Sequence, residues 1–215
     1  MCYSVDTSVI AFTVGISSSL LLYFFGNDFK INSIIAYVFL FASLMQLVDF
    51  FIWIDLDCKK GLNRFAGNIG FLLNAFQPVI LFLVSKKLYN TDKQWSSLLN
   101  IANVIYVAYV LYVYYIYLKN YDVCSNVTLD GRKAWKWYEI WDKYRVQYLY
   151  MGLLILNSLP VLKYKYLGIS GLIVMIFFIL SYFKFNNHLG TFWCALVNST
   201  PLIILIMQKV IGNKM

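Results

Sequence analysis

The sequence predicts an all-α, polytopic membrane protein with a bundle of seven transmembrane helices. Hydrophobic residues make up 61% of the 215-residue chain and charged residues only 13%, whereas soluble domains contain about 25% charged residues. The mean hydropathy is +0.67, and apolar runs long enough to cross the hydrocarbon core recur along the whole chain. Lipid is therefore predicted to be the main solvent of this protein.

Seven windows meet or nearly meet the length of about 20 mostly apolar residues that a spanning helix needs. They cover approximately residues 8–25, 32–54, 65–85, 96–118, 147–162, 166–183 and 189–208. We expect the first window to be a retained helix and not a signal peptide, because residues 1–8 contain no basic region. The prediction is thus a single seven-helix domain over residues 1–215.

The three prolines of the chain, Pro78, Pro160 and Pro201, all lie inside these windows. Each proline removes a backbone donor and is expected to kink its helix. Amide side chains lie within one turn upstream of each proline, where they could bind the carbonyl groups that lose their donors.

Residues 119–146 form the only long polar segment. Asp130-Gly131 is a typical turn dipeptide, which predicts a short extramembrane hairpin. Three tryptophans interleaved with lysines (Trp135, Trp137 and Trp141) predict instead an interfacial helix on the lipid headgroups. We expect an element that packs on the bilayer interface or on the ends of the helices.

A polar stripe is predicted across the second, third, fifth and seventh windows. Gln46, Asp49 and Trp53 share one helical face, because they follow the spacing i, i+3, i+7. An acid in a lipid-spanning helix is costly, so it usually faces the protein interior or water. The predicted polar pocket consists of Gln46, Asp49, Trp53, Asn74, Gln77, Asn157 and Asn198.

This stripe has two interpretations. In the first, the pocket handles an ion or binds a small polar ligand near Asp49. In the second, the polar side chains are hydrogen-bonding contacts that hold the helices together, as is common in membrane bundles.

An odd number of spans places the two termini on opposite sides of the membrane. Lys and Arg are almost evenly divided between the two sides, so they do not decide the orientation. The absence of positive charge in residues 1–8 and a glycosylation sequon at Asn126 favour an extracytoplasmic N-terminus and a cytoplasmic C-terminus. A second sequon at Asn198 precedes a proline inside a predicted span, so we discount it.

The same topology places Cys2, Cys58 and Cys124 on one side and Cys194 near it. Four cysteines allow three disulfide pairings, among them Cys58–Cys124 together with Cys2–Cys194. The alternatives are four separate thiols, which behave as small apolar residues when buried, or a zinc site with His188. No Cys-x-x-Cys or His-x-x-x-His spacing supports zinc.

Short motifs at both ends and in the second window resemble one family. They are Met1-Cys2-Tyr3-Ser4, Gln46-x-x-Asp49-x-x-x-Trp53 and Trp193-Cys194. Together they are similar to an uncharacterised family of multi-pass membrane proteins from bacteria and giant viruses, in which a glutamate stands at the position of Asp49. The resemblance implies a multi-helix bundle and no known activity. The frequent use of Ile, Asn, Lys and Tyr, which is typical of an AT-rich genome, fits the viral branch better.

The functional prediction has three alternatives. The first is a channel- or transporter-like protein, the second is a structural or interaction protein of a membrane or virion, and the third is a membrane-embedded enzyme or redox protein. No nucleophile elbow, P-loop or metalloprotease motif is present, so we expect no catalytic residues, metal or cofactor. The expected partners are the lipid bilayer, a small ion or polar ligand and further copies of the chain, without nucleic acid.

Overall fold

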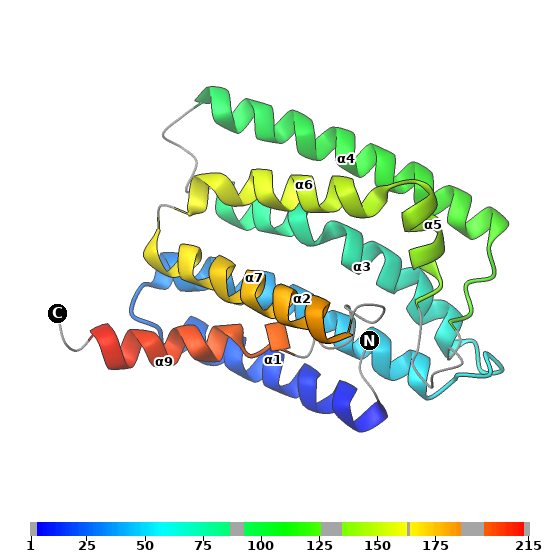
Figure 1. The fold of residues 1–215 in the computed structure, drawn as a ribbon, viewed down its shortest axis with the longest axis horizontal. Coiled ribbons are helices and arrows are strands. Elements are labelled where there is room, and N and C mark those ends of the chain that lie inside the picture. Colours follow the sequence, from blue (N-terminus) through cyan, green and yellow to red (C-terminus); the bar gives the residue numbers. More distant parts are fainter. Residues whose placement is uncertain (1–3, 87–92, 126–134, 163, 186–195, 213–215) are drawn as a thin grey trace. The chain divides into compact units, whose positions relative to one another are not determined.

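The computed structural model describes all residues except 1–3, 87–92, 126–134, 163, 186–195 and 213–215 (Figure 1). In the described residues the regular secondary structure is helical, with no strand. The helices, in chain order, are α1 (Val5–Phe25), α2 (Phe29–Trp53), α3 (Leu62–Ser85), α4 (Lys93–Asn120), α5 (Trp137–Lys143), α6 (Val146–Ser158), the 3-10 turn η2 (Leu159–Val161), α7 (Lys165–Phe185) and α9 (Thr200–Gly212). The predicted hairpin turn at residues 130–131 lies outside the described residues.

Four helices are long and apolar enough to cross a membrane, which indicates an integral membrane protein. They are α1, α2, α3 and the Trp95–Asn120 part of α4. Three shorter apolar helices, Val146–Val161, Lys165–Phe177 and Thr200–Val210, lie in the fifth, sixth and seventh predicted windows. Each of the seven windows therefore contains a helix in the part that the structure describes, and four of these helices meet the length and apolarity of a membrane span.

The chain divides into two compact units. Unit 1 contains Met1–Leu47 and Val161–Met215, and unit 2 contains Val48–Pro160. Helix α2 contributes most of its length to unit 1 and its last residues to unit 2 (Figure 1).

Unit 1 is built on the packing of α1 against α9. Ser4 begins α1 with a capping box, in which Thr7 N donates to Ser4 Oγ and Ser4 N donates to Thr7 Oγ1. The buried face of α1 consists of mostly small residues, which let a neighbouring helix approach closely. They are Ser8, Ala11, Gly15, Ser18, Ser19 and Leu22.

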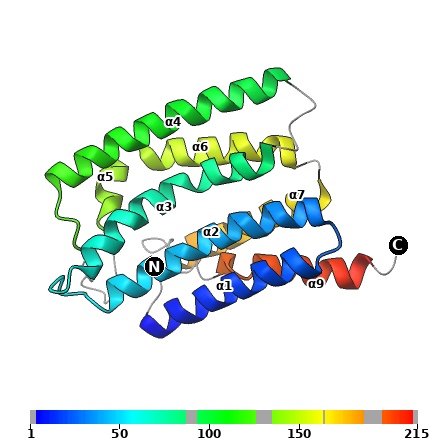
Figure 2. The same cartoon turned by 180° about the vertical axis from the view of Figure 1, so that it is seen from behind.

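Gln208 connects the end of α9 to the turn between α1 and α2. Its amide exchanges two hydrogen bonds with Asn32, at 2.7 and 3.2 Å, and also accepts from Asn27 N at 2.9 Å. Since Ser18 contacts Asn198 and Asn27 contacts Gln208, α1 and α9 run parallel. Figure 2 shows the two helices side by side from the reverse side.

Unit 2 packs α3 against α4 and α6, with α5 beside the start of α6. Asn157 of α6 donates to the carbonyl of Pro78 at 2.9 Å and exchanges two hydrogen bonds with Asn103 of α4. Tyr106 Oη donates to the carbonyl of Ala75, one turn before the proline, at 2.9 Å. The turn of α3 that contains Pro78 is thus hydrogen-bonded to both neighbouring helices, as expected for a proline inside a bundle.

Candidate functional site

Asp49, the acid of the predicted pocket, is fully buried four residues before the end of α2. Its Oδ1 accepts a hydrogen bond of 2.8 Å from the indole Nε1 of Trp135, a residue of the long polar segment. The two residues are 86 positions apart in the chain, and Trp135 is itself 5% exposed. The loop side chain therefore closes over the acid of α2.

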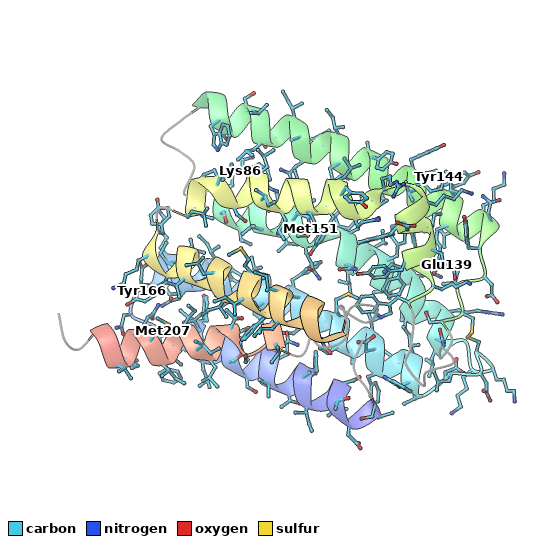
Figure 3. All side chains as sticks on the ribbon, in the orientation of Figure 1. Lys86, Glu139, Tyr144, Met151, Tyr166 and Met207 are labelled. Atoms are coloured by element: carbon cyan, nitrogen blue, oxygen red, sulfur yellow. A yellow bond between two sulfur atoms is a disulfide. The ribbon has the colours of Figure 1, made fainter. Side chains whose placement is uncertain are left out.

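The three tryptophans of the loop, Trp135, Trp137 and Trp141, form a buried cluster in unit 2. Trp135 stacks on Trp137 with ring centroids 5.0 Å apart, and Trp141 of α5 meets Phe71 of α3 edge to face at 5.8 Å. Trp137 and Trp141 are 0% and 2% exposed. Of the two predicted placements, this one corresponds to packing on the helix ends. Figure 3 shows Glu139 and Tyr144 at this short helix.

Gly70 makes room for this cluster. A Cβ atom at this position would lie 2.6 Å from Cη2 of Trp137 and 2.8 Å from Cγ1 of Val48, closer than carbon atoms normally approach. Gly67, one turn earlier, lies in the same way against Val123. These two glycines of α3 therefore accommodate the loop.

Two further connections hold the loop to the start of α3. Cys58 and Cys124 form a disulfide with their Cα atoms 6.1 Å apart. Beside it, Asn63 Nδ2 donates to the carbonyl of Ser125 and Ser125 N donates to Asn63 Oδ1, both at 2.9 Å. The pairing Cys58–Cys124, one of the predicted alternatives, is the one that the structure contains.

Asp55 organises the turn between α2 and α3. Its carboxylate accepts from the backbone N–H groups of Lys60 at 2.9 Å and Asn63 at 3.1 Å. These hydrogen bonds, that from Lys60 first, lower the pKa of Asp55 although burial opposes the shift. The ionised carboxylate thus caps the first turn of α3, where backbone N–H groups have no helical partner.

The other predicted pocket residues of unit 2 have separate surroundings. Gln77 accepts from Tyr150 Oη at 2.7 Å, and Asn157 pairs with Asn103 as described above. Asn74 is buried on α3, and Trp53 lies partly exposed at the end of α2. The structure therefore brings these amides to helix–helix contacts and brings Trp135 to Asp49.

Two predicted pocket residues belong to unit 1. Gln46 is buried on α2, one turn before Asp49. Asn198 precedes α9, where its Oδ1 lies 3.0 Å from Ser43 Oγ and its carbonyl accepts from Ser18 Oγ at 3.0 Å. The predicted set is thus divided between two compact units.

Several predicted residues lie outside the described part of the chain: Cys2, Cys194, His188 and the sequon residue Asn126. Among the residues that the structure does describe, no group of three or more His, Cys, Asp or Glu side chains could hold a metal ion.

Sequence reasoning missed the partners of the predicted polar residues. Asn103 and Tyr150 bind Asn157 and Gln77, and Asn32 binds Gln208. An amide inside an apolar window would have marked Asn32, Asn103 and Gln208, because such groups need a partner in lipid. No local signal links Trp135 to Asp49.

Comparison of the chain with protein-family models, with curated proteins and with solved structures finds no match. The site is therefore interpreted from its own geometry.

Proposed function

We propose that this integral membrane protein handles a proton, a small cation or a small polar ligand at Asp49, in the manner of a channel or transporter. The observation that carries the proposal is a fully buried carboxylate near the end of an apolar helix, held by the indole of a loop residue. An ionisable residue inside a membrane protein is by default a candidate for an ion or substrate pathway.

The loop contributes the access element of this proposal. Trp135 Nε1 donates to Asp49 Oδ1 at 2.8 Å, so the indole lies directly against the carboxylate. Movement of Trp135 would expose the acid at the end of α2, where the connecting loops begin. Binding of a proton or a cation at Asp49 would therefore compete with the indole hydrogen bond.

The proposal includes seven spans with an extracytoplasmic N-terminus. Support for an odd number comes from unit 1, where the first and last helices run parallel, as α1 and α9 do. Support for the orientation comes from the disulfide Cys58–Cys124, because disulfides persist in oxidising compartments. The resemblance to the bacterial and giant-virus family, and assembly into homo-oligomers, stay predictions.

The test uses Asp49→Asn, which keeps an oxygen acceptor for Trp135 but removes the charge. Purified protein in proteoliposomes is assayed for proton, Na⁺ and K⁺ flux. The fluorescence of Trp135 is obtained by subtracting the spectrum of the Trp135→Phe variant from that of the wild type. We expect Asp49→Asn to abolish the flux and the ligand-induced fluorescence change. Asp57→Asn is the matched control, since the Asp57 side chain is 76% exposed. Unchanged flux and fluorescence in correctly folded Asp49→Asn would contradict the proposal.

A second candidate function is a structural or interaction membrane protein without transport. It is favoured by the hydrogen bonds of Gln77 with Tyr150, Asn157 with Asn103, and Asn198 with Ser43, which join helices in the way that polar contacts stabilise membrane bundles. In this case neither the wild type nor Asp49→Asn shows a flux above that of empty liposomes. The substitution changes only the unfolding temperature.

A further inference from the structure

The described part of the last apolar segment of unit 1 contains a break just before α9. Leu196 and Val197 are helical, Asn198 and Ser199 form a turn, and α9 begins at Thr200. Pro201 has no N–H group, so it cannot donate to the carbonyl of Val197 four residues earlier. Broken helices inside a membrane protein are tolerated where other groups bind the released backbone atoms or where they line a cavity.

Two neighbouring helices converge on this break. Ser18 of α1 donates to the carbonyl of Asn198 at 3.0 Å. Ser43 of α2 lies 3.0 Å from Asn198 Oδ1. Gly15 permits the approach, because a Cβ atom there would overlap the side chain of Ser43 and lie 3.1 Å from Asn198 Cγ.

Three buried polar atoms of α1 and of residues 198–200 have no hydrogen-bond partner among the described residues. They are Ser19 Oγ, Thr200 Oγ1 and Asn198 Nδ2. Their residues are 0%, 0% and 1% exposed. Buried hydroxyl and amide groups are almost always hydrogen-bonded, so three unsatisfied groups in one region indicate a missing binding partner.

The helix register places these three residues at one level. The contacts Ser18–Asn198 and Asn27–Gln208 show that α1 and α9 run in parallel, and that a residue of α1 lies beside the residue whose number is about 180 higher. Ser19 therefore lies at the level of Ser199 and Thr200. Both Ser19 and Thr200 are on the buried sides of their helices.

The hydrogen bonds of Ser43 show which atom of Asn198 faces this region. Ser43 Oγ has one proton but lies within reach of two acceptors, Phe39 O at 2.7 Å and Asn198 Oδ1 at 3.0 Å. The two ends of an amide are assigned from such networks. Both contacts are satisfied when the Asn198 amide nitrogen donates to Ser43 Oγ, and Asn198 Oδ1 then occupies the unpaired position.

We propose that Ser19, Asn198 and Thr200 form a binding site for a small alkali cation, with Na⁺ as the preferred size. The site would then present two hydroxyl oxygens, an amide oxygen and the carbonyl of Val197, which are the hard oxygen ligands that such cations take. It contains no carboxylate, so its neutral ligand set favours a monovalent over a divalent ion. Cation sites at unwound helix segments are a recurring device of membrane transporters.

The test measures thermal unfolding of the full chain in detergent in NaCl, LiCl and KCl against choline chloride at equal ionic strength. A ligand that binds only the folded state raises the unfolding temperature with its concentration. We expect a saturable increase with Na⁺ that is absent with choline. Ser19→Ala combined with Thr200→Val should weaken the apparent Na⁺ affinity roughly tenfold or more, since hydrogen-bonding contacts to charged groups are strong.

Ser33→Ala is the matched control, because its hydroxyl donates to Phe29 O on the outer side of α2 in the same unit. Thr200→Ser keeps the hydroxyl and should keep the Na⁺ response even if the double variant does not fold. Equal unfolding temperatures of the wild type in NaCl and in choline chloride would contradict the proposed Na⁺ site. The unpaired polar atoms of Ser19, Asn198 and Thr200 would then be expected to bind water. Asp49→Asn should leave the Na⁺ response unchanged, so failure of the Asp49 proposal and failure of this one are distinguishable.

Discussion

At the scale of single residues, Trp135 is the side chain whose contact is most informative. Trp135→Phe keeps the ring stack but removes the N–H donor to the buried Asp49 carboxylate. We expect a loss of about 1.5–3 kcal/mol in the free energy of unfolding, the range for hydrogen bonds to charged groups. Chemical unfolding in detergent measures the loss. Tyr115→Phe, at a side chain of α4 that is 61% exposed, is the control and should change the stability by less than half as much.

Asp55 predicts a pH dependence of stability. Its pKa is lowered in the folded state, so its contribution is fully present above the unfolded pKa of about 3.9. The contribution is lost as the pH falls through the lower folded value. We expect the wild-type unfolding temperature to fall more steeply than that of Asp55→Asn when the pH is lowered below about 4. Parallel pH profiles of the two proteins would show that the carboxylate does not cap α3.

At the scale of helices, two glycines form a matched pair. Gly15 of α1 lies against Ser43 and Asn198, whereas a Cβ at Gly152 of α6 would meet nothing within 4 Å. Gly15→Ala is expected to cost about 1–3 kcal/mol through overpacking. Gly152→Ala should be neutral or stabilising by up to about 1 kcal/mol, because alanine is the better helix former. Thermal unfolding of both variants measures the contrast, and equal effects would rule out close packing at Gly15.

The helix boundaries show how far local sequence signals reach. The apolar windows locate α2 and α3 to within three residues at each end, because the length of each apolar run and the charged residues that flank it indicate where the helix leaves the lipid. Helix α1 also begins three residues before its predicted window, because the capping box of Ser4 and Thr7 precedes the apolar run. The sequence predicts that the tryptophans of residues 135–141 lie either on the bilayer interface or on the ends of the helices. Only the tertiary contact between Trp135 and Asp49 shows that they lie on the helix ends.

The candidate site was less predictable than the helices. Helical spacing correctly groups residues on one face of one helix, but it carries no information about which face meets which neighbour. Asn157 therefore could not be assigned to Asn103, which is 54 residues away, nor Asn198 to Ser43. The amides of the predicted pocket proved to have different neighbours in two units, because each buried amide finds the nearest available partner.

At the scale of the whole molecule, the disulfide connects segments 66 residues apart. A chain-entropy estimate for a closed loop of this length gives a stabilisation of about 4 kcal/mol. We expect Cys58→Ser, Cys124→Ser and the double variant to lower the unfolding temperature by the same amount, and the reduced wild type to match them. Thiol counting on the denatured, unreduced protein should find at most two of the four cysteines. Four reactive thiols would exclude the bond.

The disulfide also has a consequence for biosynthesis. Cys58 precedes α3 and Cys124 follows α4, so the two sulfur atoms can meet only if the chain crosses the membrane an even number of times between them. A nascent chain in which either helix failed to insert would leave the two thiols in different compartments. Formation of the bond therefore excludes molecules in which only one of the two helices has been integrated, and a pulse-chase assay of its oxidation would report when the two cysteines reach the same side of the membrane.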